Sequence, residues 1–240
     1  MPKHCTKKVA VATSTQVPKK SGTVQVFLHP GKRCGDAKNT SFSTKPTDVD
    51  SKNAKEHFKY DHTPIRFEDG KRHGNNYEYA VAIPGDIDNS HTDDSADWTT
   101  HEKLHEQLKK IGINHVIYSS RNDHRIKNKG AENEQSARPR FHVLFPLSKP
   151  LPDKDKYQKY CRWFIRKFKG DLKVCGFAQL LFGFGDCKKP IIHIYSEGRC
   201  IDEVLTDTDL AEAAACGGRE GGREIVILHP VTNWSFLTLI

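Results

Sequence analysis

Two aspartates spaced one residue apart follow an apolar run in the stretch YAVAIPGDIDNSH, residues 79–91. On a strand, alternate side chains point to the same face, so we expect Asp86 and Asp88 to lie side by side while Ile87 points into the core. Two carboxylates held this close repel each other unless a cation lies between them. Because hard oxygen ligands suit Mg²⁺ or Mn²⁺, the pair is a candidate metal site. The alternative is a turn, in which Asp and Asn side chains bond to nearby backbone groups.

Three further segments carry groups that could converge with this pair. In RPRFHVLFPL, Arg140 and His142 share one face of an expected strand and offer a row of hydrogen-bond donors suited to a triphosphate. A structural histidine at a strand start is the alternative. Asp171, directly after a helix stop at Gly170, could supply a third carboxylate or simply cap a loop. The polar loop from 120 to 139 offers further basic side chains, for phosphate binding or only for solubility: Arg121, His124, Arg125, Lys127 and Lys129.

Short runs rich in β-branched and aromatic residues, bounded by turn residues, predict the strands that must carry these groups. The runs TPIRFE and NYEYAVAI, joined by a polar segment, form a predicted hairpin that leads directly into the two aspartates. The strand that carries His142 is expected to end at Pro146 and Pro150, because proline cannot donate to a strand ladder. The predicted strands cover residues 24–28, 63–68, 76–83, 114–119, 140–147, 191–195 and 199–205.

Apolar residues at helical spacing predict two amphipathic helices between these strands. The first lies within residues 98–112, where Thr99 and Glu102 indicate a capping box and Gly112 a stop. The second lies within residues 153–170. Its apolar face consists of Tyr157, Tyr160, Phe164 and Phe168. Weaker helical segments are predicted at residues 51–60 and 207–218.

Strands interleaved with two amphipathic helices predict an α/β protein of the α+β type, with helices covering one face of a mixed, largely antiparallel sheet. The chain of 240 residues is long enough for one sizeable domain with appendages. Residues 1–22 are polar and basic and are expected to be a disordered arm. The main domain is expected over residues 23–205, and residues 206–240 would be a C-terminal extension of unknown role. A loop as long as 120–139 is unusual in a compact domain, and such loops tend to be functional or mobile.

The formal net charge of +8 favours a polyanionic partner, although most of it lies in one segment. Residues 1–38 carry eight Lys and Arg against one acid. In the remainder, residues 149–189 hold eleven Lys and Arg against four acids, whereas residues 86–102 hold six acids and no Lys or Arg. A basic surface beside an acidic site suits metal-assisted chemistry on a phosphate backbone. A solvated helix face is the alternative for the basic segment.

The seven cysteines are odd in number, scattered and without a C-x-x-C pair. This pattern indicates reduced thiols rather than a disulfide framework or a zinc ribbon. No apolar run approaches the length of a bilayer span, and the N-terminus lacks the apolar region of a signal peptide. We therefore expect a cytoplasmic protein without a membrane partner.

The order of the polar motifs resembles the archaeo-eukaryotic primase superfamily, in particular the primase-polymerase domains of phages, plasmids and other mobile elements. The motifs are D-x-D at Asp86 and Asp88, then a strand with Arg140-Phe141-His142 followed by apolar residues, then an isolated Asp171 before an A-Q-L-L-F-G strand. The resemblance covers residues 63 to 205, approximately. Each motif alone is weak, and it is the ordered set that is specific.

The resemblance implies a nucleotidyltransferase with an RNA-recognition-like sheet. Such an enzyme uses two Mg²⁺ or Mn²⁺ ions to add nucleotides, from NTP or dNTP, to a primer on a single-stranded DNA template. Asp86, Asp88 and Asp171 would be the catalytic metal ligands. The nucleotide-binding residues would be His142, Arg140, Arg121, His124 and Lys127. The sequence has no G-x-x-x-x-G-K-[ST] motif, so unwinding would come from a separate helicase or from a part of the protein outside this sequence.

Arg140 departs from the family pattern, which often has a small residue, commonly Ser, two places before the histidine. The arginine either adds a phosphate contact or redirects the site. A rolling-circle replication endonuclease is a second interpretation, but its chemistry needs an H-x-H motif and the chain has none. A third is a single-stranded nucleic-acid-binding module without catalysis, which would use the basic segments and exposed aromatics such as Trp163. That module explains the charge and leaves the aspartates without a role.

Overall fold

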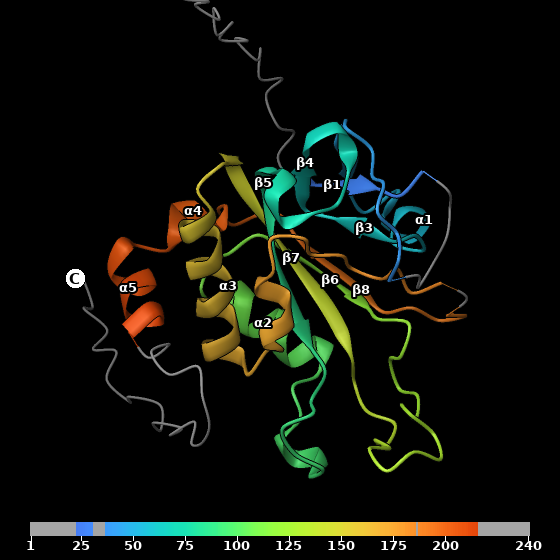
Figure 1. The fold of residues 1–240 in the computed structure, drawn as a ribbon. Helices are drawn as coiled ribbons and strands as arrows, with labels where there is room; N and C mark the ends of the chain where they lie inside the picture. Colours follow the sequence, from blue (N-terminus) through green and yellow to red (C-terminus); the bar gives the residue numbers. More distant parts are fainter. Residues whose placement is uncertain (1–22, 31–36, 186, 216–240) are drawn as a thin grey trace, which may run out of the picture.

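The computed structural model describes residues 23–30, 37–185 and 187–215 (Figure 1). Its strands are β1 (Val24–Leu28), β2 (Thr47–Val49), β3 (His62–Thr63), β4 (Ile65–Phe67), β5 (Tyr77–Ile87), β6 (His115–Ser119), β7 (Phe141–Leu151) and β8 (Ile192–Tyr195). Its helices are α1 (Ala54–His57), α2 (His101–Lys110), α3 (Lys154–Phe168), α4 (Ile201–Val204) and α5 (Asp207–Ala215). Short 3₁₀ turns lie at Glu68–Gly70 (η1), Gly74–Asn76 (η2), Ser95–Asp97 (η3) and Leu172–Cys175 (η4). The arm predicted at 1–22 lies outside the described residues.

The strands and helices confirm the predicted α+β class, but the strands form two antiparallel sheets where one mixed sheet was predicted. Five strands pair in the order β4-β5-β7-β6-β8, and three pair in the order β2-β1-β3. Helices α2 and α3 cover one face of the larger sheet, as expected, and the smaller sheet with α1 packs on the opposite face (Figure 1). The sequence does not predict β2, because a strand of three residues is too short to show an alternating pattern.

The long central strands β5 and β7 carry the conspicuous polar residues. They pair antiparallel, with Asp86 opposite His142. The predicted strand end at Pro146 is wrong, since β7 continues through Pro146 and Pro150. Proline is tolerated there because β6 pairs with β7 only as far as Leu144, so the rest of β7 has a ladder on one side only.

The two long helices follow the predicted amphipathic pattern. The apolar face of α3 is buried as predicted, at Tyr157, Tyr160, Phe164 and Phe168. Helix α2 is capped one residue later than predicted: Thr100 Oγ accepts a first-turn N–H, whereas the Thr99 N–H donates to the Asn89 side chain. Helix α3 ends at Phe168 and is capped by Lys169, which is left-handed with φ 57° and lies one residue before the predicted stop.

The predicted strand at 199–205 is wrong, because these residues include helix α4. The Glu203 carboxylate accepts a hydrogen bond from the Cys200 N–H at 2.9 Å, which stabilises the start of the helix. The expected A-Q-L-L-F-G strand is wrong: residues 178–183 form no strand, and Leu181 makes an isolated bridge with His62. The helical end predicted at 207–218 is present as α5, which buries Leu210 in the main core, so the core continues past residue 205.

Two glycines let α3 pack closely on β5 beside the aspartates. A Cβ at Gly85 would lie 2.4 Å from Cε1 of Phe164 and 2.6 Å from Cγ1 of Val143. A Cβ at Gly170 would lie 2.8 Å from the same Phe164 atom. Glycine therefore precedes Asp86 because an aromatic ring of α3 contacts the strand backbone at that point.

Replacement of Gly85 by alanine should lower the free energy of unfolding by about 1–3 kcal/mol, because the added methyl group overpacks the core against Phe164. Chemical denaturation followed by tryptophan fluorescence measures the loss. Phe164→Leu removes ring atoms from this space, so the double variant should lose less than the sum of the two single losses. Strictly additive losses would show that Gly85 and Phe164 do not compete for the space.

Candidate active site

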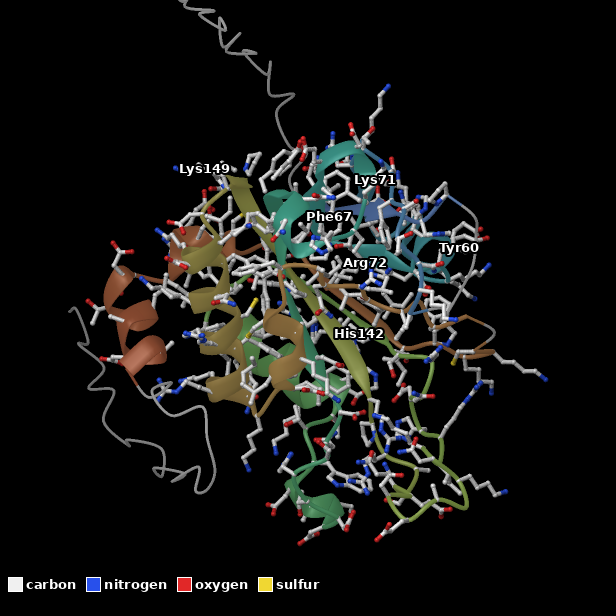
Figure 2. All side chains as sticks on the ribbon, in the orientation of Figure 1. Tyr60, Phe67, Lys71, Arg72, His142 and Lys149 are labelled. Carbon is white, nitrogen blue, oxygen red and sulfur yellow. The ribbon has the colours of Figure 1, made fainter. Side chains whose placement is uncertain are left out.

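Asp86 and His142 lie opposite each other on β5 and β7, with His142 near the middle of the sheet (Figure 2). The Nδ1 atom of His142 lies 3.2 Å from Oδ1 of Asp86. This nitrogen has no hydrogen bond of good geometry, so the contact is electrostatic rather than a directed bond. Ile87 is buried in the core beneath the helices, which confirms that it points away from the acidic face.

Asp88 is the more buried of the two carboxylates, with 15% of its side chain exposed against 30% for Asp86. Lys127 Nζ lies 2.6 Å from one Asp88 oxygen, and Arg140 Nε lies 2.9 Å from the other. The Arg140 contact is an ion pair without hydrogen-bond geometry. Each oxygen of Asp88 therefore faces a positive charge, and Lys127 brings the 120–139 loop back to the end of β5.

Arg140 is almost fully buried, and its terminal nitrogens are directed at the loop that precedes β7. They donate to the carbonyl oxygens of Asn122, Arg125 and Ser136 and to Oε1 of Gln135. Burial lowers the pKa of Arg140, and the charge of Asp88 opposes this effect. The guanidinium thus holds the loop and Asp88 together.

Asp171 lies beside Asp86 through the main chain. The Asp171 N–H donates to the Asp86 carbonyl oxygen at 2.9 Å, across the tight connection that follows α3. The Asp171 carboxylate accepts the N–H of Lys173 at 2.9 Å and so caps η4. The sequence left two interpretations open, a cap and a third acid near the first two; the cap is present, and the third acid stays a prediction.

The other basic residues predicted for this site lie along the 120–139 loop. The Arg121 guanidinium lies 4.3 Å from the ring centre of Phe182. His124 Nε2 lies 3.8 Å from Asp123 Oδ1. The side chains of Arg125 and Lys129 are exposed. In the described part of the 120–139 loop, Lys127 is the residue that forms an ion pair with an aspartate of the D-x-D motif.

A buried tyrosine and histidine lie behind His142, and the sequence analysis did not identify them. Tyr118 on β6 is opposite His142 in the ladder, and its hydroxyl lies 2.7 Å from Nε2 of His62. His62 Nδ1 lies 2.9 Å from the Tyr60 carbonyl oxygen, which can only accept, so Nδ1 carries the proton and Nε2 accepts from Tyr118. Burial lowers the pKa of His62 to about 3 and raises the pKa of Tyr118. Both groups are therefore neutral.

Arg138, also missed, joins the two loops that project from the same end of the sheet (Figure 1). It donates to the carbonyl oxygens of Asn89 and Thr92, at 2.8 and 3.0 Å, and to the Asp93 carboxylate at 2.6 Å. The Asn89 side chain in turn donates to the Pro139 carbonyl oxygen at 2.8 Å. The segment after β5 and the segment before β7 are therefore fixed to each other beside the D-x-D motif.

The donor types at this end of the sheet fit a hard divalent ion and a polyphosphate, because carboxylates favour Mg²⁺ or Mn²⁺ and cationic side chains bind phosphate. The acidic groups are not gathered into a tight ligand set. Within the described residues, the set of three ligand atoms lying within 4.8 Å of one another is formed by His101, Asp123 and His124, not by Asp86, Asp88 and Asp171. Lys127 and Arg140 supply the countercharge of Asp88 instead.

Comparisons of the chain with protein-family models, with curated proteins and with solved structures found no match. None of the helices in the described part of the chain has the length and apolar character needed to span a bilayer.

Proposed function

We propose that this chain is a primase-polymerase catalytic domain. It would transfer nucleotides from NTP or dNTP to a primer on a single-stranded DNA template, in the replication of a mobile element. One observation carries the proposal: three segments far apart in the sequence converge, because Asp86 is opposite His142 across two strands and accepts a backbone hydrogen bond from Asp171. These are the three segments on which the resemblance to the archaeo-eukaryotic primase superfamily rests.

In this function the acidic residues and the basic residues have separate tasks. Asp86, Asp88 and Asp171 would hold Mg²⁺ or Mn²⁺, which when bound activates the attacking hydroxyl and stabilises the leaving group. His142, beside Asp86, would bind a phosphate of the incoming nucleotide. Lys127, which pairs with Asp88, would exchange this contact for a phosphate oxygen.

Arg140 is a positioning residue in this proposal. Its side chain is 1% exposed and its terminal nitrogens donate to protein acceptors, which leaves it poorly placed to bind a nucleotide directly. It fixes Asp88 and the loop that carries Lys127. This role accounts for an arginine where the resembled family often has a small residue.

The test is nucleotide incorporation on single-stranded DNA, with and without an annealed primer, in Mg²⁺, in Mn²⁺ or in chelator, and with NTP or dNTP. We expect metal-dependent products, and the unprimed lane separates initiation from extension. DNA binding is measured in parallel under the same conditions. Binding that is equal in metal and in chelator, with no product in any lane, would favour the nucleic-acid-binding module over the enzyme.

A further inference from the structure

A second group of metal-ligand side chains lies beside the candidate active site. His101 is the first residue of α2, and Asp123 and His124 lie in the loop after β6. One ligand atom from each of the three lies within 4.8 Å of the other two. His101 and Asp123 are buried, with 1% and 5% of their side chains exposed, whereas 58% of the His124 side chain is exposed. Two of the three side chains are thus buried, and the third is open to solvent.

The buried histidine has an unsatisfied nitrogen directed into this group. His101 Nε2 lies 3.2 Å from Asp123 Oδ2, yet it makes no hydrogen bond of acceptable geometry. The carboxylate has partners of its own: Oδ2 accepts from the Ser119 hydroxyl at 2.7 Å, and Oδ1 accepts from the Arg140 N–H at 2.9 Å. A buried polar atom without a partner is costly, and a cation between the nitrogen and the carboxylate would satisfy both.

The exposed histidine is also held in place. His124 has a left-handed backbone with φ 52°, which is uncommon for a residue other than glycine. Its N–H donates to the Arg138 carbonyl oxygen at 3.0 Å, and its ring lies nearly parallel to that of His101, with centroids 6.3 Å apart. The loop therefore presents this imidazole toward the buried pair rather than leaving it free in solvent.

The donor set favours a particular class of ion. Two imidazoles and one carboxylate suit Zn²⁺, Co²⁺ and similar transition metals, whereas Mg²⁺ prefers oxygen ligands alone. Ligands at ~2.0–2.1 Å from a tetrahedral Zn²⁺ lie about 3.4 Å apart. His101 Nε2 lies 3.2 Å from Asp123 Oδ2, close to that value, and His124 Nε2 lies 3.8 Å from the other oxygen of the same carboxylate, Oδ1. The solvent-facing side leaves room for water as the fourth ligand.

We propose that His101, Asp123 and His124 bind a transition-metal ion of the Zn²⁺ class, with water completing the coordination. This site is separate from the D-x-D motif and does not depend on the proposed function. It would join the start of α2 to the 120–139 loop. Because Asp123 also holds the backbone of Arg140, the ion would stiffen the support of Asp88 without contacting it.

Cobalt titration of the full chain tests the proposal, after chelator treatment and in excess Mg²⁺ to occupy the D-x-D carboxylates. We expect one equivalent of Co²⁺ to bind with visible d–d absorption. His124→Gln should weaken this binding about tenfold or more, since even second-shell changes cost tenfold or more. The side chain of His124 is exposed, so the variant is expected to fold. His91→Gln, an exposed histidine in the neighbouring loop, and His193→Gln, in the separate group of His105, His115 and His193, should bind Co²⁺ like the wild type.

A second readout uses Zn²⁺ itself. Zn²⁺ at a hundredfold excess over its Kd should raise the melting temperature of the wild type by about 5 °C and should have little effect on His124→Gln. The proposal is overturned if the wild type shows no d–d absorption, or if His124→Gln binds Co²⁺ and responds to Zn²⁺ like the wild type. Loss of binding in His193→Gln alone would place the ion in the other histidine group and would equally overturn it.

Discussion

Asp86→Asn is expected to reduce nucleotide incorporation by about a hundredfold to a thousandfold, the scale on which loss of one preorganised electrostatic contact lowers turnover. The amide keeps the size of the side chain and removes the charge that a divalent ion requires. Because the Asp86 side chain is partly exposed and its contact with His142 is electrostatic only, stability should change by less than about 1 kcal/mol. Primer extension at saturating nucleotide, with a parallel denaturation curve, measures both effects.

A matched control separates the loss of the site from the loss of an acidic charge. Asp97→Asn removes an exposed acid from the same acidic stretch and should leave incorporation unchanged. Asp88→Asn is a less selective variant, because it also leaves the buried Arg140 without its carboxylate. If Asp86→Asn extends primers as well as Asp97→Asn does, the D-x-D motif is not the catalytic centre.

The free energy of unfolding should fall by about 5 kcal/mol between pH 7 and pH 4.5, because each group contributes ~1.36 kcal/mol per unit of pKa difference. Burial is the main cause that lowers the pKa of His62 to about 3 and of His115 to about 4. Above pH ~6.5 both rings are neutral in the folded and unfolded states. As the pH falls below that value, the unfolded chain binds two protons that the folded protein does not, so stability is lost.

Denaturant midpoints recorded in steps from pH 7 to pH 4.5 measure this dependence. The window lies above the ordinary carboxylate pKa of ~4, so the lowered pKa values of Asp123 and Glu102 add their effect mainly at lower pH. His115→Gln should remove about half of the loss that His62 and His115 cause together. A stability profile that stays flat across this range would show that neither imidazole is held neutral in the folded protein.

The parts of the fold that follow from local pattern could be predicted from the sequence. Alternation along β5 predicted that Ile87 points into the core between the two aspartates, and helical spacing predicted the buried face of α3. Predictions of secondary structure from local pattern were wrong where particular side-chain or strand-pairing contacts decide the conformation. The contact of Glu203 with the Cys200 N–H favours a helix in a segment that we predicted to be a strand. The free side of β7 permits a proline that would end a central strand.

The arrangement of the candidate site depends on contacts between distant residues, which spacing alone cannot reveal. The register that sets Asp86 opposite His142 is decided by the pairing of two whole strands. The approach of Lys127 to Asp88 depends on how a long loop folds back. Arg138 and Arg140 offered a signal, since two arginines beside a buried strand must find acceptors, but the sequence does not say that those acceptors are carbonyl groups of neighbouring loops.

The contacts of Arg138 affect how the segments after β5 and before β7 open locally. They also affect how well these two segments tolerate insertions. Surface loops usually exchange their amide protons independently and accept insertions. Here Arg138, in the segment before β7, donates to Asn89 and Thr92 in the segment after β5, and the Asn89 side chain donates to the Pro139 carbonyl oxygen. Amide protons in the two segments should therefore exchange with a common rate, as one cooperative unit. An insertion near residue 92 would loosen the segment around Pro139 as well. The length of one segment therefore constrains the length of the other.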